Sequence, residues 1–378
     1  MKKFKKIIFG YLSWRIVLIF FIFIGTYLFS LQNNYLGGGK QIYLTNPYLY
    51  SWLNFDGEHF LSIARLGYQP LNYFLFPLYP LLTKLVAAIL GGKFINYVYS
   101  GLFISNFSFL IGIYGFWKII RLDYSEKIAK FALLLLFFFP TSFFFGSFYS
   151  ESLFFCLAIW SFYFARKENW FLSGLLAGLA STTRILGMAL FAGLIIEFIF
   201  SKKNNNWKNF VVLVSFSLFG LIAYMIFLKL RTGDYLYFLH NVSIFGEQRS
   251  SKLVFFPQVI YRYIFKIIPN LNFSYFPVIY TTFMEFIIGI LFLLLSIFSF
   301  AKQRYSYAVY SFSAFLIPSF SGSFSSVPRY FLISFPLFIL MAGYLKNPPR
   351  YIRNVVFAIL FILLLLSTAL FSRGYWIS

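Results

Sequence analysis

The run 7-IIFGYLSWRIVLIFFIFIGTYLFSL-31 decides the fold, because it is long and apolar enough for a helix that crosses a membrane. Similar runs recur along the 378 residues, of which 60% are hydrophobic and only 11% are charged. A soluble domain has about 25% charged residues. We therefore predict an all-α polytopic membrane protein in contact with membrane lipids.

The flanks of the apolar runs carry most of the charge. The basic start 2-KKFKK-6 precedes a run longer than a cleavable signal core, and no small-residue cleavage site follows, so we interpret it as a retained signal anchor. The net charge of +22 is spread between the runs and forms no compact basic face, so we predict no nucleic-acid partner. Cys156 is the only cysteine, which excludes an intramolecular disulfide.

The charges also determine how we thread the chain. If 76–91 stays on the outer surface, the basic clusters after the later runs all face the cytoplasm, whereas a crossing at 76–91 turns them outward. The predicted spans are 7–31, 94–120, 128–146, 150–166, 170–183, 185–201, 208–230, 277–301, 305–320, 330–345 and 351–371. We thus predict a single domain, 1–378, of about eleven spans in the plasma membrane, with the C-terminus outside.

This threading leaves three regions outside: a large first loop, 32–93, with short surface helices, a second loop, 231–276, and the turn 321–329. The first loop contains Asp56, Glu58, His59 and Arg65 within 51-SWLNFDGEHFLSIARLGYQP-70. A carboxylate beside the membrane surface can act as a general base, with Glu58 and His59 tuning or positioning it. The alternative is a solvated or helix-capping aspartate and a first-turn glutamate.

Divalent metal is a weaker interpretation of this loop. Asp56 and Glu58 offer two oxygen ligands, and His59 and His240 are the only histidines, which argues against zinc. We predict no metal and no cofactor.

Three arginines, Arg65, Arg184 and Arg329, fall on the outer side in this threading. Arginine holds phosphate oxygens in a fork, so these residues suit a lipid phosphate, and the alternative is contact with lipid headgroups. Glu151, at the outer start of a span within 140-PTSFFFGSFYSES-152, is costly enough there to suggest a site, although it is also a favourable first-turn acid.

Four blocks resemble a known family. The runs 55-FDGEHFLSIARLGY-68 with 76-FPLYP-80, 140-PTSFFFGSFYSESLF-154, 177-AGLASTTRILG-187 and 328-PRYFLISFPLF-338 are similar, in this order, to motifs of the PIG-V family. Its members are mannosyltransferases of GPI-anchor synthesis and their prokaryotic relatives. Phe55 stands where that family usually has tryptophan, and the stretch 231–276 is short.

The resemblance implies a GT-C-like helical bundle with a catalytic aspartate on its first outer loop, and Asp56 matches that aspartate. The family's recurring polar positions correspond here to His59, Tyr79, Tyr149, Glu151, Arg184, Arg329 and Tyr330. The implied reaction is extracytoplasmic, inverting transfer of a hexosyl group, mannosyl in the family, from a polyprenyl-phosphate sugar to a lipid-linked or glycan acceptor.

Two rival functions stay open. A transporter or flippase of a lipid-linked saccharide also needs many spans and phosphate-binding arginines, but its charges should follow a path through the membrane midplane. A structural scaffold leaves the 51–80 cluster unexplained.

Overall fold

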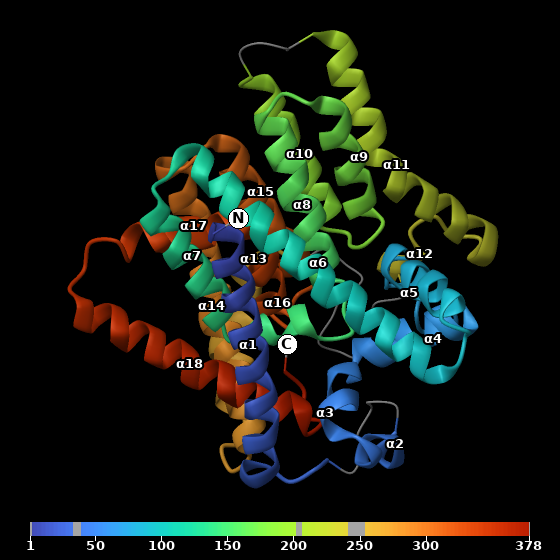
Figure 1. The fold of residues 1–378 in the computed structure, drawn as a ribbon, viewed down its shortest axis with the longest axis vertical. Helices are drawn as coiled ribbons and strands as arrows, with labels where there is room; N and C mark the ends of the chain where they lie inside the picture. The colour runs from blue at the N-terminus through green and yellow to red at the C-terminus, as the bar shows by residue number, and fades with distance from the viewer. Residues whose placement is uncertain (1, 33–38, 202–205, 241–253, 378) are drawn as a thin grey trace. The chain divides into compact units, whose positions relative to one another are not determined.

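All regular elements that the computed structural model describes, over residues 2–32, 39–201, 206–240 and 254–377, are helices (Figure 1). In chain order they are α1 (Lys2–Leu28), α2 (Lys40–Thr45), α3 (Pro47–Tyr50), η1 (Ser51–Leu53), α4 (Asp56–Leu66), α5 (Leu78–Ile89), α6 (Phe94–Asp123), α7 (Glu126–Phe138), η2 (Ser142–Gly146), α8 (Glu151–Arg166), α9 (Trp170–Ser181), α10 (Gly187–Ile199), α11 (Trp207–Thr232), α12 (Tyr237–His240), α13 (Phe256–Arg262), η4 (Tyr263–Ile267), η5 (Ile268–Asn270), α14 (Phe276–Lys302), α15 (Tyr305–Ser319), α16 (Val327–Ile333), α17 (Phe335–Tyr344) and α18 (Arg350–Ser372). The prediction of an all-α protein is confirmed.

Five helices in the described part of the chain are long and apolar enough to cross a membrane, namely α1, α6, α11, α14 and α18. Each coincides with a predicted span to within a few residues. The pair α16 and α17 makes a sixth candidate, although the chain bends by 79° between the two helices. By their length and composition, these helices indicate a membrane protein.

The other five predicted spans are occupied by shorter helices. The predicted span 128–146 is interrupted, because α7 ends at Phe138 and the chain continues through Pro140 into η2. The helices α8, α9, α10 and α15 are also shorter than the roughly 20 residues that a straight span needs. The count of about eleven spans therefore stays a prediction.

The chain divides into two compact units that interleave in sequence. We call the first the Asp56 unit, which comprises residues 1–67, 79–156 and 341–377. The second, comprising 68–78, 157–340 and 378, is the Arg184 unit. Seven of the ten predicted site residues belong to the Asp56 unit, and the other three belong to the Arg184 unit.

Within the Asp56 unit, α1 packs against both α6 and α18. The first residues of α1 meet the end of α6, where the rings of Phe4 and Tyr114 lie 5.2 Å apart. The last residues of α1 meet the end of α18, where Arg373 Nε donates a hydrogen bond to the Phe29 carbonyl at 2.9 Å. Helix α1 is therefore antiparallel to α6 and parallel to α18, as the predicted threading requires.

Basic clusters that the threading assigns to one face gather at one end of each unit. In the Arg184 unit, the buried Glu197 carboxylate lies 3.3 Å from Arg166 Nε and 2.8 Å from Arg304 Nη2. In the Asp56 unit, Lys127 Nζ donates to the Lys346 carbonyl at 3.1 Å. Loops predicted to share a side of the membrane thus contact one another within each unit.

Candidate functional site

Asp56 is the first residue of α4, at the end of a tight turn. The preceding residue, Phe55, has φ 57° and ψ −119°, a backbone conformation that residues with a side chain rarely adopt. Strain of this kind costs on the order of 1–3 kcal/mol and persists only where the surroundings enforce it. The Asp56 side chain is half-buried. The turn therefore holds one carboxylate in a defined and partly accessible position.

Helix α4 forms because its sequence is amphipathic. Phe60, Leu61, Ile63 and Ala64 are buried on one side, as the i, i+3, i+4 spacing requires. Gly67 ends the helix with φ 84°, and its N–H donates to the Ile63 carbonyl. The prediction of short helices within the first loop, 32–93, is thus confirmed at this point of the chain. Asp56 lies inside the first turn of α4, and the N-cap residue Phe55 makes no side-chain capping hydrogen bond.

Hydrogen bonds from two other segments hold the turn in front of Asp56. The Tyr149 hydroxyl donates to the Asn54 carbonyl at 2.6 Å, and the Phe148 N–H donates to the Trp52 carbonyl at 2.9 Å. On the α18 side, Asn54 Nδ2 donates to the Phe371 carbonyl at 2.7 Å. Residues far apart in sequence therefore fix Trp52 and Asn54, just before Phe55.

The segment that supplies Tyr149 is buried throughout 139–155 and is anchored in turn on α6. Ser105 Oγ donates to the Tyr149 carbonyl at 3.0 Å, and it lies 2.9 Å from the Tyr79 hydroxyl, which donates to the Gly101 carbonyl. Tyr79 and Tyr149, both predicted to contact substrate, therefore brace the turn from inside the protein. Glu151, at the start of α8, is fully buried.

The turn does not lie over the outer end of α1 but beside the middle of that helix. The Trp52 ring stacks under the Arg15 guanidinium at 4.2 Å, and Arg15 is near the midpoint of α1. The half of α1 that continues to Leu28 extends about 20 Å further. This part of the predicted outer loop is therefore recessed relative to the end of α1, which the prediction of surface helices did not anticipate.

Arg15 itself is an uncompensated charge in a membrane-spanning helix. Its Nη1 is buried without a hydrogen-bond acceptor among the described residues, and no carboxylate lies beside it there. Such a charge costs about 2.5–3.5 kcal/mol near the centre of a span. An orphaned donor adds about 1–3 kcal/mol. Stacking on a ring returns about 0.5–2 kcal/mol. Stacking on Trp52 alone does not offset these costs.

The remaining polar residues of α4 differ in their surroundings. Glu58 and His59 are half-buried, and burial raises the pKa of the Glu58 carboxyl. Arg65 is exposed, with its guanidinium 4.8 Å from the centre of the Phe94 ring. It lies at the far end of the helix from Asp56, about 13 Å along the axis. Arg65 therefore resembles a surface cation–π contact more than a ligand of the same substrate group.

Three predicted site residues belong to the Arg184 unit. The Arg184 guanidinium lies 5.2 Å from the centre of the Tyr330 ring, although 146 positions separate them in sequence. Arg184 and Arg329 are both buried, with 9% and 5% of their surface exposed. The structure thus brings Arg184 and Tyr330 together, as expected of one site. Their proximity to Asp56 stays a prediction.

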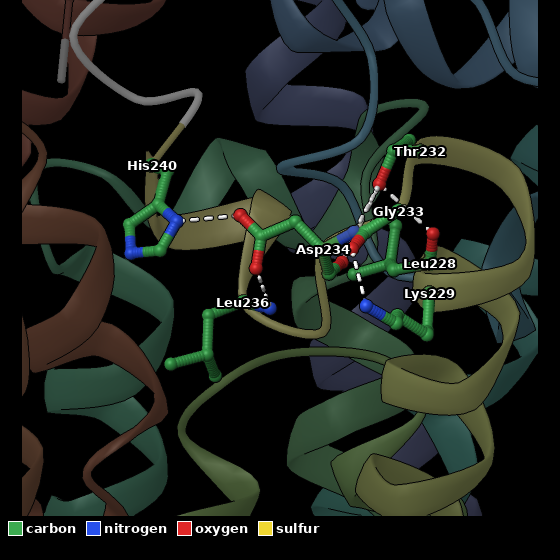
Figure 2. Close-up of polar contacts among 7 residues, drawn as sticks. All are labelled: Leu228, Lys229, Thr232, Gly233, Asp234, Leu236 and His240. Atoms are coloured by element: carbon green, nitrogen blue, oxygen red, sulfur yellow. Dashed lines mark hydrogen bonds and ion pairs between the residues drawn. The ribbon is translucent and has the colours of Figure 1, made fainter.

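The second histidine, His240, takes part in a local arrangement. The Asp234 carboxylate accepts from the Leu236 N–H at 2.9 Å and lies 2.5 Å from His240 Nδ1 (Figure 2). These two contacts lower the pKa of Asp234, with the Leu236 N–H as the larger cause. His240 is exposed and Asp234 is half-buried, and the pair lies at α12. The following residues, 241–253 of the predicted second outer loop, lie outside the described part.

Sequence reasoning missed Asn54, Ser105 and Arg15. Asn54 and Ser105 are ordinary residues in sequence, and only their hydrogen bonds to the Tyr149 backbone and side chain identify them. Arg15 carried a usable signal, since a charge inside a 25-residue apolar run is itself unusual. Among the described residues, no three His, Cys, Asp or Glu side chains gather closely enough to hold a metal ion.

No family model matches the chain, and no curated protein or solved structure matches it either.

Proposed function

We propose that the protein is a membrane glycosyltransferase that moves a hexosyl group from a polyprenyl-phosphate sugar to the hydroxyl of a lipid-linked or glycan acceptor. Asp56 is the general base. The four blocks that resemble the PIG-V family support mannose as the sugar and a GT-C-like bundle as the architecture. The proposal includes eleven spans in the plasma membrane and an active site that opens on the extracytoplasmic side.

One observation carries the proposal, namely the way Asp56 is held. A general base must meet its substrate in a fixed geometry, because misplacement by about 1 Å can cost about 10²-fold in rate. Asp56 follows a strained residue, and Tyr149 and the α18 backbone fix the turn through Asn54. A carboxylate with only a solvated or capping role has no need of such support.

The proposed reaction is a single displacement at the anomeric carbon. Asp56 takes the proton of the acceptor hydroxyl, whose oxygen forms the new bond to that carbon. The bond from the anomeric carbon to the phosphate oxygen breaks, and the lipid phosphate leaves with the electron pair on the opposite face. This is the one-base logic of inverting glycosyl chemistry. Cationic donors such as Arg184 and Arg329 stabilise the charge of the leaving phosphate.

The runner-up is a flippase for a lipid-linked saccharide. The observation in its favour is that the buried residues Arg184 and Arg329 belong to a different unit from Asp56. Under this alternative the arginines carry the function and Asp56 is dispensable. The two functions therefore predict different behaviour for the same variant.

The test compares Asp56→Asn with wild type in a transfer assay that supplies polyprenyl-phosphate sugars and native lipid extract. We expect the rate to fall by at least about 10²-fold, the lower range for loss of a general base. The matched control is Asp123→Asn. Asp123 is an exposed carboxylate at the last residue of α6, and this variant should transfer at the wild-type rate. A folded Asp56→Asn protein with near wild-type transfer refutes the assignment of the base. If wild type transfers no sugar, and Asp56→Asn still moves the lipid-linked saccharide across the membrane, the protein is a flippase.

A further inference from the structure

Arg15 is a cation that the structure places against the turn before Asp56. Its guanidinium stacks on Trp52, four residues before Asp56. On another side it lies against Gly146, where a Cβ atom would fall 2.0 Å from Nη1. A glycine at this position leaves room for the guanidinium beside the segment that supplies Tyr149. The sequence and fold thus accommodate an arginine at the depth of the turn.

The guanidinium has no internal acceptor for its hydrogen bonds. No hydrogen bond or ion pair involves Arg15 within the described ranges, and Nη1 is enclosed. Arg15 as a whole is half-buried, so the residue is not sealed inside the protein. Arg353 provides a contrast in the same unit. It also stacks on a ring, that of Phe131 at 5.6 Å, but its Nη1 donates to the Pro348 carbonyl.

The reaction proposed at Asp56 requires a phosphate group near the Arg15 guanidinium. In the proposed displacement, the phosphate oxygen is bonded to the same carbon that the activated hydroxyl attacks. The phosphate must therefore lie at the depth of the Asp56 turn, which is the middle of α1 rather than the headgroup level. A planar fork of N–H donors matches phosphate oxygens and is strongest where water is excluded.

We propose that Arg15 binds the phosphate of the isoprenoid lipid donor, held in place by the Trp52 ring and the space at Gly146. This inference rests on the proposed function and adds to it a phosphate ligand within the Asp56 unit itself. Arginine is suited to the position because it remains charged without a carboxylate beside it.

The test measures binding rather than transfer. Purified protein in detergent micelles is titrated with undecaprenyl phosphate, undecaprenol or inorganic phosphate, and the apparent Kd is taken from the rise in melting temperature. Wild type should be stabilised by undecaprenyl phosphate and not by undecaprenol. Arg15→Met should weaken the apparent affinity by about 10- to 100-fold, the usual worth of charge-assisted hydrogen bonds. Arg353→Met, the matched control, should bind as wild type does.

Each outcome decides the inference. If Arg15→Met does not yield a monodisperse protein, Arg15→Gln, which keeps polar donors and loses the charge, takes its place with the same expected loss. Affinity within twofold of wild type in these variants overturns the proposal. So does equal stabilisation by undecaprenol, or stabilisation by inorganic phosphate alone, which indicates a site for a free anion. If wild type binds the lipid phosphate through Arg15 but transfers no sugar, the phosphate site is supported and the proposed function is refuted.

Discussion

Replacing Tyr149 with phenylalanine tests whether the support of the turn matters for function. The change removes only the hydroxyl that donates to the Asn54 carbonyl at 2.6 Å. Both residues are fully buried, so phenylalanine fills the same space and water does not replace the lost donor. The variant isolates one hydrogen bond two residues before Asp56.

The size of the effect follows from that burial. Leaving a buried carbonyl without its donor costs about 1–3 kcal/mol. For a protein of this length, we take a shift of roughly 2 °C in melting temperature for each kcal/mol, which gives a loss of about 2–6 °C. The turn that carries Asp56 should also relax. Since small displacements of a catalytic group cost up to about 10²-fold, we expect transfer to fall by at least about 10-fold.

The assay pairs a thermal melt in detergent with sugar transfer, and Tyr224→Phe is the control. Tyr224 is also buried, and its hydroxyl donates to the Tyr73 carbonyl at 2.7 Å in the Arg184 unit. Its loss of stability should be similar, while transfer should stay within twofold of wild type. A Tyr149→Phe protein that is destabilised as much as the control, yet transfers at the wild-type rate, refutes the positioning argument.

Two further predictions concern α4. Burial raises the pKa of Glu58 in the folded protein, so the folded state keeps this proton to higher pH than the unfolded chain and ionisation opposes folding. The melting temperature of Glu58→Gln should therefore exceed that of wild type by an amount that grows from about pH 4, the unfolded value, and levels off above the raised pKa. A difference that shrinks with rising pH contradicts this. The second prediction tests the threading with Arg65→Cys and Asp123→Cys in a Cys156→Ser background. Arg65 contacts Phe94 at the start of α6 and Asp123 is its last residue, so the two positions mark ends of α6 that lie about 43 Å apart. An impermeant thiol reagent outside intact cells should label only Arg65→Cys, and labelling of Asp123→Cys instead inverts the topology.

The sequence by itself determined the class of the protein and the positions of its long helices. Apolar runs near 7–31, 94–120, 208–230, 277–301 and 351–371 became α1, α6, α11, α14 and α18 within a few residues. This succeeds because a helix in lipid satisfies its own backbone and needs only length and hydrophobicity, both of which are local properties. The start of α4 at Asp56 and its end at Gly67 were local in the same way.

Only the tertiary structure decided where the long loop goes and what supports Asp56. No local pattern indicates that Trp52 lies beside the middle of α1, or that Tyr149 donates to the backbone just before Asp56. Nor does sequence show that α7 ends at Phe138, leaving a buried irregular segment to brace the turn. The reason is that buried backbone groups must find partners, and outside helices those partners come from segments distant in the chain. Hydropathy reports how much surface each segment must bury, but packing selects the neighbour against which it is buried.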